Sequence, residues 1–124
     1  MFLEWTDPPF APGHWVPEMI TTAGGVPTIG AAGQKSVRVT WEQALATEPD
    51  LVVCAPCGYD LEGSAALAAD LISAAVLPAA VPVWAVDANA SFARPGPRLV
   101  DGVENLASII AGGQPPTSAA RQLR

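Results

Sequence analysis

Hydrophobic and polar positions follow two periods along this chain, one typical of strands and the other typical of helices. Short and almost wholly apolar runs at residues 2–5, 50–54 and 81–86 predict three strands. The run at 50–54 has the uniform apolar character of a parallel strand that is covered on both faces. Pro82 falls near the start of the third run, where it still permits a strand.

Two helices are predicted between the first and second strands. The first begins near Trp15 and ends at Gly24-Gly25, because glycine is a common residue at helix C-caps. The second follows Thr40, because residues 40–43 match the capping box, with Thr40 as N-cap and Gln43 three positions later.

Two longer helices follow the second and third strands. Asp60 is a candidate N-cap for the first of them, whose apolar residues recur on one face at helical spacing. Pro97 lies in the first turn of the last helix, and Gly112-Gly113 end that helix. The polar segment 114–124 is expected to be a disordered, frayed tail.

This order of elements predicts one α/β domain over residues 1–113, a three-layer Rossmann-like lobe with a small parallel sheet flanked by helices. In such sheets ligands bind beyond the carboxyl ends of the strands. The loops there begin at Thr6, Ala55 and Asp87 and hold most of the aromatic and unusual side chains. The predicted ligand-binding residues are Pro9, Phe10, His14, Trp15, Tyr59, Phe92 and Arg94.

Composition and charge narrow the function classes. The chain has 124 residues, and 12 acidic against 6 basic side chains give a net charge of −6. No basic stripe is present to neutralise phosphates, so a nucleic-acid partner is not expected. No apolar run approaches the roughly 18 residues that a membrane span needs, so membrane insertion is not expected either.

The amino terminus bears on the compartment. It lacks the basic segment followed by an apolar segment that a secretory signal has. As given, the chain is therefore expected in the cytoplasm. As a fragment of an exported precursor, it would instead work in the periplasm or outside the cell.

No catalytic arrangement stands out in the sequence. The serines lack a nucleophile-elbow context, and the single histidine has no acidic or cysteine partners at metal-ligand spacing. Cys54 and Cys57 have the spacing of a dithiol redox motif, but the predicted helix begins beyond both sulfurs and would stabilise neither thiolate. We expect no enzyme, no metal site and no cofactor, and a dithiol redox protein is the remote alternative.

Three segments carry a resemblance to a known family. They are LEWTDPPFAPGHWVPEMITTAGG, VTWEQALATEPDLVVCAPCGYDLE and VWAVDANASFARPGPRLVDGVENLA, and they cover nearly all of the chain before the tail. In this order they resemble the C-terminal lobe of the vitamin B12 and iron-siderophore family of ABC-transporter substrate-binding proteins. The first and third segments are particularly similar to its cobalamin-binding subgroup.

The resemblance implies a class III substrate-binding fold, in which a long helix joins two Rossmann-like lobes and the ligand lies in the cleft between them. The chain would supply the second lobe only. Its ligand would be cobalamin, another corrinoid or an iron-siderophore-like molecule, and its protein partner an ABC permease. Glu42 matches the family's glutamate that pairs with permease arginines. Ser36 falls near the position at which the B12 binder has a ligand-contacting tryptophan.

A lobe without its counterpart also suggests a second hypothesis. The surface that would face the other lobe would be exposed, and exposed apolar patches are commonly buried by association. The chain would then be a cytosolic interaction module that forms a homodimer and takes no part in transport.

Overall fold

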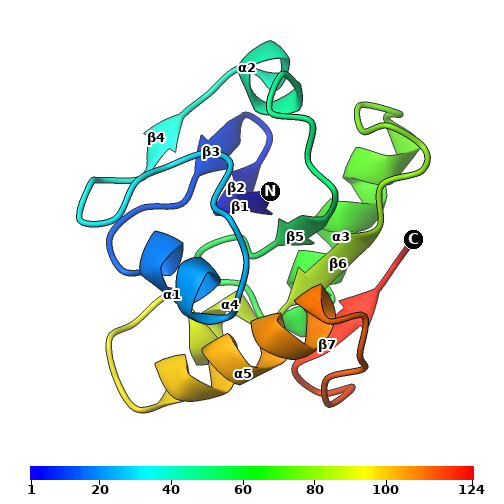
Figure 1. Cartoon of the computed structure of the whole chain (residues 1–124). Coiled ribbons are helices and arrows are strands. Elements are labelled where there is room, and N and C mark those ends of the chain that lie inside the picture. The colour runs from blue at the N-terminus through cyan, green and yellow to red at the C-terminus, as the bar shows by residue number, and fades with distance from the viewer.

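The computed structural model describes all residues from Met1 to Arg124 and contains two small sheets (Figure 1). The larger sheet has the strand order β1 (Phe2–Leu3), β5 (Val52–Cys54), β6 (Val83–Val86) and β7 (Ala120–Gln122). β1, β5 and β6 are parallel, with Phe2 opposite Val53 and Val53 opposite Trp84. β7 runs antiparallel to β6, so the predicted parallel strands are confirmed and the fourth strand makes the sheet mixed.

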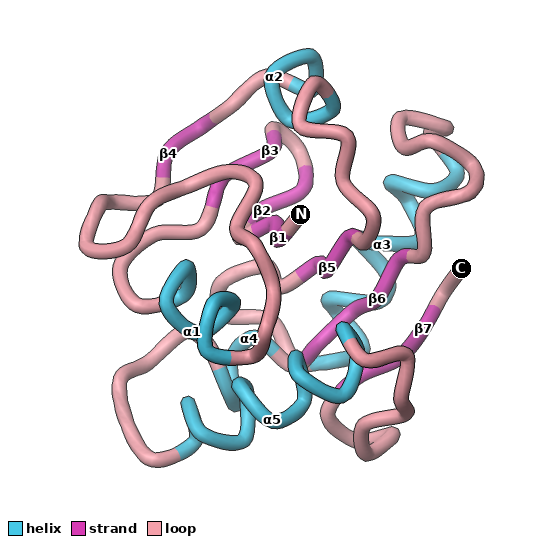
Figure 2. The backbone as a smooth tube through the Cα atoms, in the orientation of Figure 1, coloured by secondary structure: helices cyan, strands magenta, loops and turns pink.

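Helices cover both faces of the larger sheet (Figure 2). α3 (Leu61–Ser73) packs on one face, and the other carries α1 (Val16–Thr22), α4 (Ala88–Ser91) and α5 (Arg98–Ile110). Successive strand residues point to opposite faces, so Val53 joins the core under α1 and α5 while Cys54 joins the core under α3. This is the α/β, Rossmann-like lobe that the sequence predicts.

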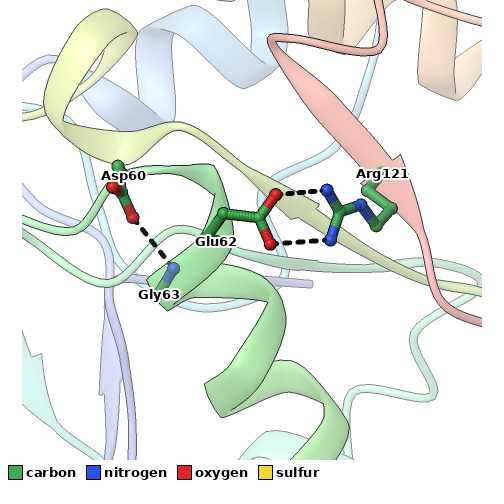
Figure 3. A network of polar contacts seen from close by, with 4 residues as sticks. All are labelled: Asp60, Glu62, Gly63 and Arg121. Atoms are coloured by element: carbon green, nitrogen blue, oxygen red, sulfur yellow. Dashed lines mark hydrogen bonds and ion pairs between the residues drawn. The ribbon is translucent and has the colours of Figure 1, made fainter.

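Two of the predicted helix starts are confirmed by their side-chain caps. Before α2 (Trp41–Leu45), the Thr40 hydroxyl accepts from the Gln43 N–H at 3.1 Å, and the Gln43 side chain accepts from the Thr40 N–H at 2.9 Å. At the start of α3, the Asp60 carboxylate accepts from the Gly63 N–H at 2.9 Å (Figure 3). These bonds satisfy N–H groups that the first turn leaves unpaired. None of the helices has both the length and the apolar character that crossing a bilayer requires.

The smaller sheet is not predicted by the sequence. It is antiparallel and consists of β2 (Trp5–Thr6), β3 (Pro9–Ala11) and β4 (Val37–Arg38). Consecutive prolines at 8 and 9 indicate a stiff loop, because proline has no N–H to donate to a neighbouring strand. Pro9 can nevertheless take part in the sheet, because the pairing at this position uses its carbonyl and not an N–H. The carbonyl accepts from the Val39 N–H at 2.9 Å.

The prediction of a frayed tail over residues 114–124 is wrong. Part of this segment forms β7, and the Leu123 N–H donates to the Val83 carbonyl at 2.9 Å. The Arg121 guanidinium forms a bidentate ion pair with Glu62 of α3, as Figure 3 shows. Without β7, one edge of β6 would present unpaired backbone N–H and C=O groups. A polar segment can form hydrogen bonds to these groups as well as an apolar one can, so the polar composition of residues 114–124 does not prevent pairing.

Candidate functional site

Two adjoining pockets open at the carboxyl ends of β1, β5 and β6, where the segments that follow these strands come together. The inner pocket has a volume of about 210 Å³ and the outer pocket one of about 350 Å³. The inner pocket is lined by Phe2, Glu4, Gly13, His14, Trp15, Val16, Ala55, Cys57, Ala88, Phe92 and Ala93. The outer pocket is lined by Glu4, Trp5, Pro8, Phe10, Ser36 and Cys57. Glu4 and Cys57 line both pockets.

Trp15 and Phe92 form the aromatic wall of the inner pocket. The Trp15 Nε1 donates to the Phe92 carbonyl at 2.9 Å, which joins the segment between β3 and α1 to the end of α4. The Phe92 ring packs at a tilt against Phe2 of β1, with ring centroids 5.3 Å apart. Because a hydrogen bond and a core contact hold the two rings, this wall is formed before any ligand arrives.

His14 stands beside this wall in a left-handed backbone conformation, with a φ of 56° and its ring centroid 5.7 Å from that of Trp15. Its N–H donates to the Gln34 carbonyl at 2.6 Å, and its carbonyl accepts from the Gly33 N–H at 2.8 Å. Such a conformation costs a non-glycine residue on the order of 1–3 kcal/mol, and surrounding bonds must hold it. The two bonds to residues 33 and 34 do so and leave the imidazole exposed.

Trp5 and Phe10 form the aromatic part of the outer pocket. They lie opposite each other as a cross-strand pair of β2 and β3. Trp5 also meets the Tyr59 ring edge-on, with centroids 5.5 Å apart and an angle of 68° between the planes. Edge-to-face pairs of this kind contribute about 0.5–1.5 kcal/mol beyond their buried area, so Trp5 is well held. Each of the two pockets therefore has aromatic side chains in its lining.

Glu4 fixes the loops at the boundary between the pockets. Its carboxylate accepts from the Gly13 N–H at 3.0 Å, its N–H donates to the Phe10 carbonyl at 3.0 Å, and its carbonyl accepts from the Cys57 N–H at 3.1 Å. Bonds to a charged acceptor are roughly twice as strong as neutral ones. Glu4 therefore positions both the loop with His14 and the loop with Cys57.

The two cysteines lie in different environments. Cys54 is completely buried in β5, and burial raises the pKa of its thiol to about 12. Cys57 is exposed in the loop after β5. α3 begins at Leu61, beyond both sulfurs, as the sequence predicts. Cys54 therefore contributes to core packing. Its buried thiol, with a raised pKa, argues against a dithiol redox pair.

Four of the predicted binding residues line the pockets. His14, Trp15 and Phe92 line the inner pocket, and Phe10 lines the outer one. The sequence reasoning did not assign Glu4, Trp5 or Cys57 to the site. Cys57 closely follows the second predicted strand, at the ligand-binding edge of the sheet. Glu4 and Trp5 fall within the predicted strand 2–5, whereas β1 ends at Leu3 and leaves both residues at that edge.

The other predicted site residues lie elsewhere. Tyr59 is at the edge of the outer pocket, against Trp5, with 38% of its surface exposed. Pro9 is buried within β3 and lines neither pocket. Arg94 is exposed and donates to the Asn89 side-chain oxygen at 3.1 Å, so it also lies outside both pockets. Glu42 is exposed in the first turn of α2.

The largest cavity lies at the opposite edge of the sheet. It has a volume of about 530 Å³ and lies among the amino ends of β1 and β5, α1 and α5. Apart from Thr28 and Asp50, the side chains that line it are apolar. In parallel sheets ligand sites lie beyond the carboxyl ends of the strands, whereas this cavity lies at the amino ends. We therefore place the candidate site at the two smaller pockets.

Two further findings bear on what the candidate site can bind. No three His, Cys, Asp or Glu residues gather closely enough to hold a metal ion by themselves. Comparisons of the chain with protein-family models, with curated proteins and with solved structures find no match. The case for a function therefore depends on the geometry of the inner and outer pockets and on the resemblance described above.

Proposed function

We propose that this chain is the binding lobe of an ABC-importer substrate-binding protein, with a cobalamin-like corrinoid or an iron-siderophore-like molecule as its ligand. The observation that carries the proposal is the aromatic lining of the two pockets at the carboxyl ends of the parallel strands. Trp15 and Phe92 supply it in the inner pocket, and Trp5 and Phe10 supply it in the outer pocket. Rigid aromatic side chains bury a large area of a ring-shaped ligand at little entropic cost.

The sizes of the pockets support a ligand that rests across both. Volumes of about 210 and 350 Å³ lie at or below the lower end of the range of about 300–1,000 Å³ that is typical of pockets enclosing a ligand. A corrinoid or a siderophore would therefore contact both pockets and remain uncovered on its far side. A second wall, from another lobe or from a partner, would complete its burial.

Two positions of the sequence resemblance bear on the proposal. Ser36 stands near the position of the ligand-contacting tryptophan of the B12 binder and lines the outer pocket, so this pocket lacks that aromatic contact. The Ser36 hydroxyl donates to the Ala11 carbonyl at 2.8 Å. Glu42, which matches the docking glutamate, is exposed at the start of α2 and accessible to permease arginines. The first position thus falls within the candidate site and the second on the surface.

Isothermal titration calorimetry with cobinamide, cobalamin and a ferric hydroxamate siderophore tests the proposal. We expect one of these ligands to bind with a Kd in the micromolar range, and Trp15→Ala to weaken binding by about tenfold or more. Trp41→Ala is the matched control, because Trp41 lies in α2, outside both pockets. No heat change at high micromolar ligand, with the chain alone and with a complementary lobe, would exclude the proposed function.

A second candidate function is self-association without transport. Two apolar side chains at the large cavity favour it, since Val26 is 81% exposed and Ile110 is 37% exposed. Exposed apolar groups of this kind are commonly covered in homodimers. Light scattering separates the two functions. A mass that doubles with concentration and returns to the monomer value in Val26→Asp supports self-association, whereas a monomer that binds cobinamide supports the binding lobe.

A further inference from the structure

A third pocket lies between the loop after β6, one face of α5 and the segment that leads into β7. It has a volume of about 350 Å³ and is formed within residues 87–91, 98–105 and 116–119. It shares no lining residue with the inner or the outer pocket. The Asp87 N–H donates to the Ala119 carbonyl at 3.0 Å, which ties two of its sides together. We call it the acidic pocket.

Three carboxylates line the acidic pocket against one guanidinium. Asp87 directly follows β6, Asp101 and Glu104 lie on successive turns of α5, and Arg98 is at the start of that helix. The one ion pair of the structure joins α3 to β7, so none of these four charges has a partner of opposite sign. Asp101 and Glu104 are three positions apart, where like charges on a helix repel each other. The lining therefore carries an uncompensated negative charge.

Ser91 brings a buried hydroxyl to the same pocket. Ser91 is only 8% exposed, and it lines the acidic pocket but neither the inner nor the outer one. Helical hydroxyls commonly donate to the carbonyl four positions earlier, as those of Thr21 and Ser73 do here. The Ser91 hydroxyl forms no hydrogen bond, and the corresponding carbonyl, that of Asp87, already accepts the Ser91 N–H at 3.2 Å. Buried hydroxyls in folded proteins generally have a partner, so this one is available to a bound molecule.

We propose that the acidic pocket binds an organic cation with N–H donors, namely the ammonium group of a small alkylamine. An ammonium group has three donors and no acceptor, and the carboxylates and the Ser91 hydroxyl oxygen are acceptors. The three carboxylates do not gather closely enough to hold a metal ion by themselves. Since the acidic pocket is separate from the inner and outer pockets, the inference is independent of the proposed function.

The two kinds of acceptor contribute differently. Asp101 and Glu104 are exposed, so their attraction for a cation is screened by salt and does not depend on N–H groups. Ser91 is buried, so its hydroxyl can interact only with a group that enters the pocket and donates a hydrogen bond. The carboxylates therefore supply most of the affinity, and Ser91 supplies the preference for an N–H donor over a quaternary cation.

Three probes with the same five-carbon chain test this inference. 1,5-Diaminopentane has two charges and N–H donors, its bis(trimethylammonium) analogue has the charges only, and 1,5-pentanediol has no charge. We expect the diamine to bind with a Kd in the millimolar range or below, at least about fivefold more tightly than the quaternary analogue, and the diol not to bind. Backbone amide shifts in a two-dimensional NMR titration measure the three affinities. The shifts should be confined to residues 87–91, 98–105 and 116–119.

Substitutions separate a site from general attraction to an acidic chain. Asp101→Asn with Glu104→Gln should weaken binding of the diamine by about fivefold or more, and Ser91→Ala should remove its advantage over the quaternary analogue. Glu18→Gln with Asp70→Asn is the matched control, because it changes the net charge equally at exposed positions outside the pocket. Unchanged thermal unfolding shows that each variant is folded.

Four outcomes would overturn the inference. Equal weakening in the two double variants would mean that the diamine responds to net charge alone. Equal affinities of the diamine and its quaternary analogue would exclude a site for N–H donors. A preference that survives in folded Ser91→Ala would remove the buried hydroxyl from the site. The absence of amide shifts within the acidic pocket at high millimolar diamine would exclude binding there.

Discussion

The Trp15 indole Nε1 donates a hydrogen bond to the Phe92 carbonyl at 2.9 Å, although the two residues are 77 positions apart in the sequence. The bond joins the segment between β3 and α1 to the end of α4, which follows β6. Phe92 in turn packs against Phe2 within the core. The aromatic wall of the inner pocket is therefore an extension of the hydrophobic core.

We expect Trp15→Phe to lower the free energy of unfolding by about 1–3 kcal/mol, because the Phe92 carbonyl loses its donor in a partly buried setting. Binding of cobinamide should weaken as well, since the wall is no longer held. Urea unfolding and calorimetric titration measure the two effects. Trp41→Phe is the control, because Trp41 lies outside both pockets. Equal losses in the two variants would contradict a special role for the Trp15–Phe92 bond.

Stability should depend on pH through the amino group of Met1, which donates to the Leu51 carbonyl. Burial lowers the pKa of this group from 8.0 to about 6, and the nearby Asp50 carboxylate partly opposes the shift. Between these two values the unfolded chain keeps a proton that the folded chain has lost. The free energy of unfolding therefore rises with pH across this window, by about 2–3 kcal/mol in total.

Urea unfolding at about pH 5 and about pH 8 in constant salt measures this dependence. The matched control is the same chain with an acetylated amino group, which cannot bind the proton. We expect the rise in stability to be absent from the acetylated form. An equal rise in both forms would assign the pH dependence to groups other than the Met1 amine.

Removal of residues 119–124 should destabilise the chain by about 3 kcal/mol or more, because β6 loses several backbone hydrogen bonds that contribute about 0.5–1.5 kcal/mol each. The core also loses Ala120. Glu62→Gln is the comparison, since it removes the ion pair with Arg121 and keeps the strand. The pair is exposed, so the midpoint of thermal unfolding should hardly change in that variant. A comparable loss in both variants would show that the ion pair, and not the strand, holds the segment.

Ser36→Trp should extend the aromatic surface of the outer pocket. We expect cobinamide to bind about tenfold more tightly, as a further buried aromatic contact can contribute on the order of 1–2 kcal/mol. Some stability is lost, because the Ser36 hydroxyl no longer donates to the Ala11 carbonyl. Titration of this variant beside Ser73→Trp, at an exposed position in α3, separates a pocket effect from added hydrophobicity. Unchanged or weaker binding in Ser36→Trp would place the ligand away from the outer pocket.

The elements that the sequence predicts well are those that depend on neighbouring residues. The capping box at Thr40 needs only four consecutive residues, and α3 and α5 each show a helical apolar period over 13 residues. β7 could not be predicted in this way, because its pairing depends on the free edge of β6 and not on its own composition. The two- and three-residue strands of the smaller sheet are too short to show a period.

The same distinction applies to the candidate site. Trp15 and Phe92 could be predicted because they lie in the segments that connect the predicted strands to the following helices, and both line one pocket. Glu4 acts through bonds to distant loops, which only the folded chain brings together. Pro9 and Arg94 were predicted from the same loops, but the pairing of β3 buries the first and a bond to Asn89 engages the second.

Cys54 and Cys57 are close in sequence but differ in their access to solvent. A thiol-alkylating reagent applied to the native protein reaches Cys57, whereas Cys54 is enclosed in the core and keeps its proton. The natural sequence therefore offers a single attachment point for a fluorescent dye, at the boundary of the inner and outer pockets. A dye at that point would report occupancy of either pocket without any added cysteine.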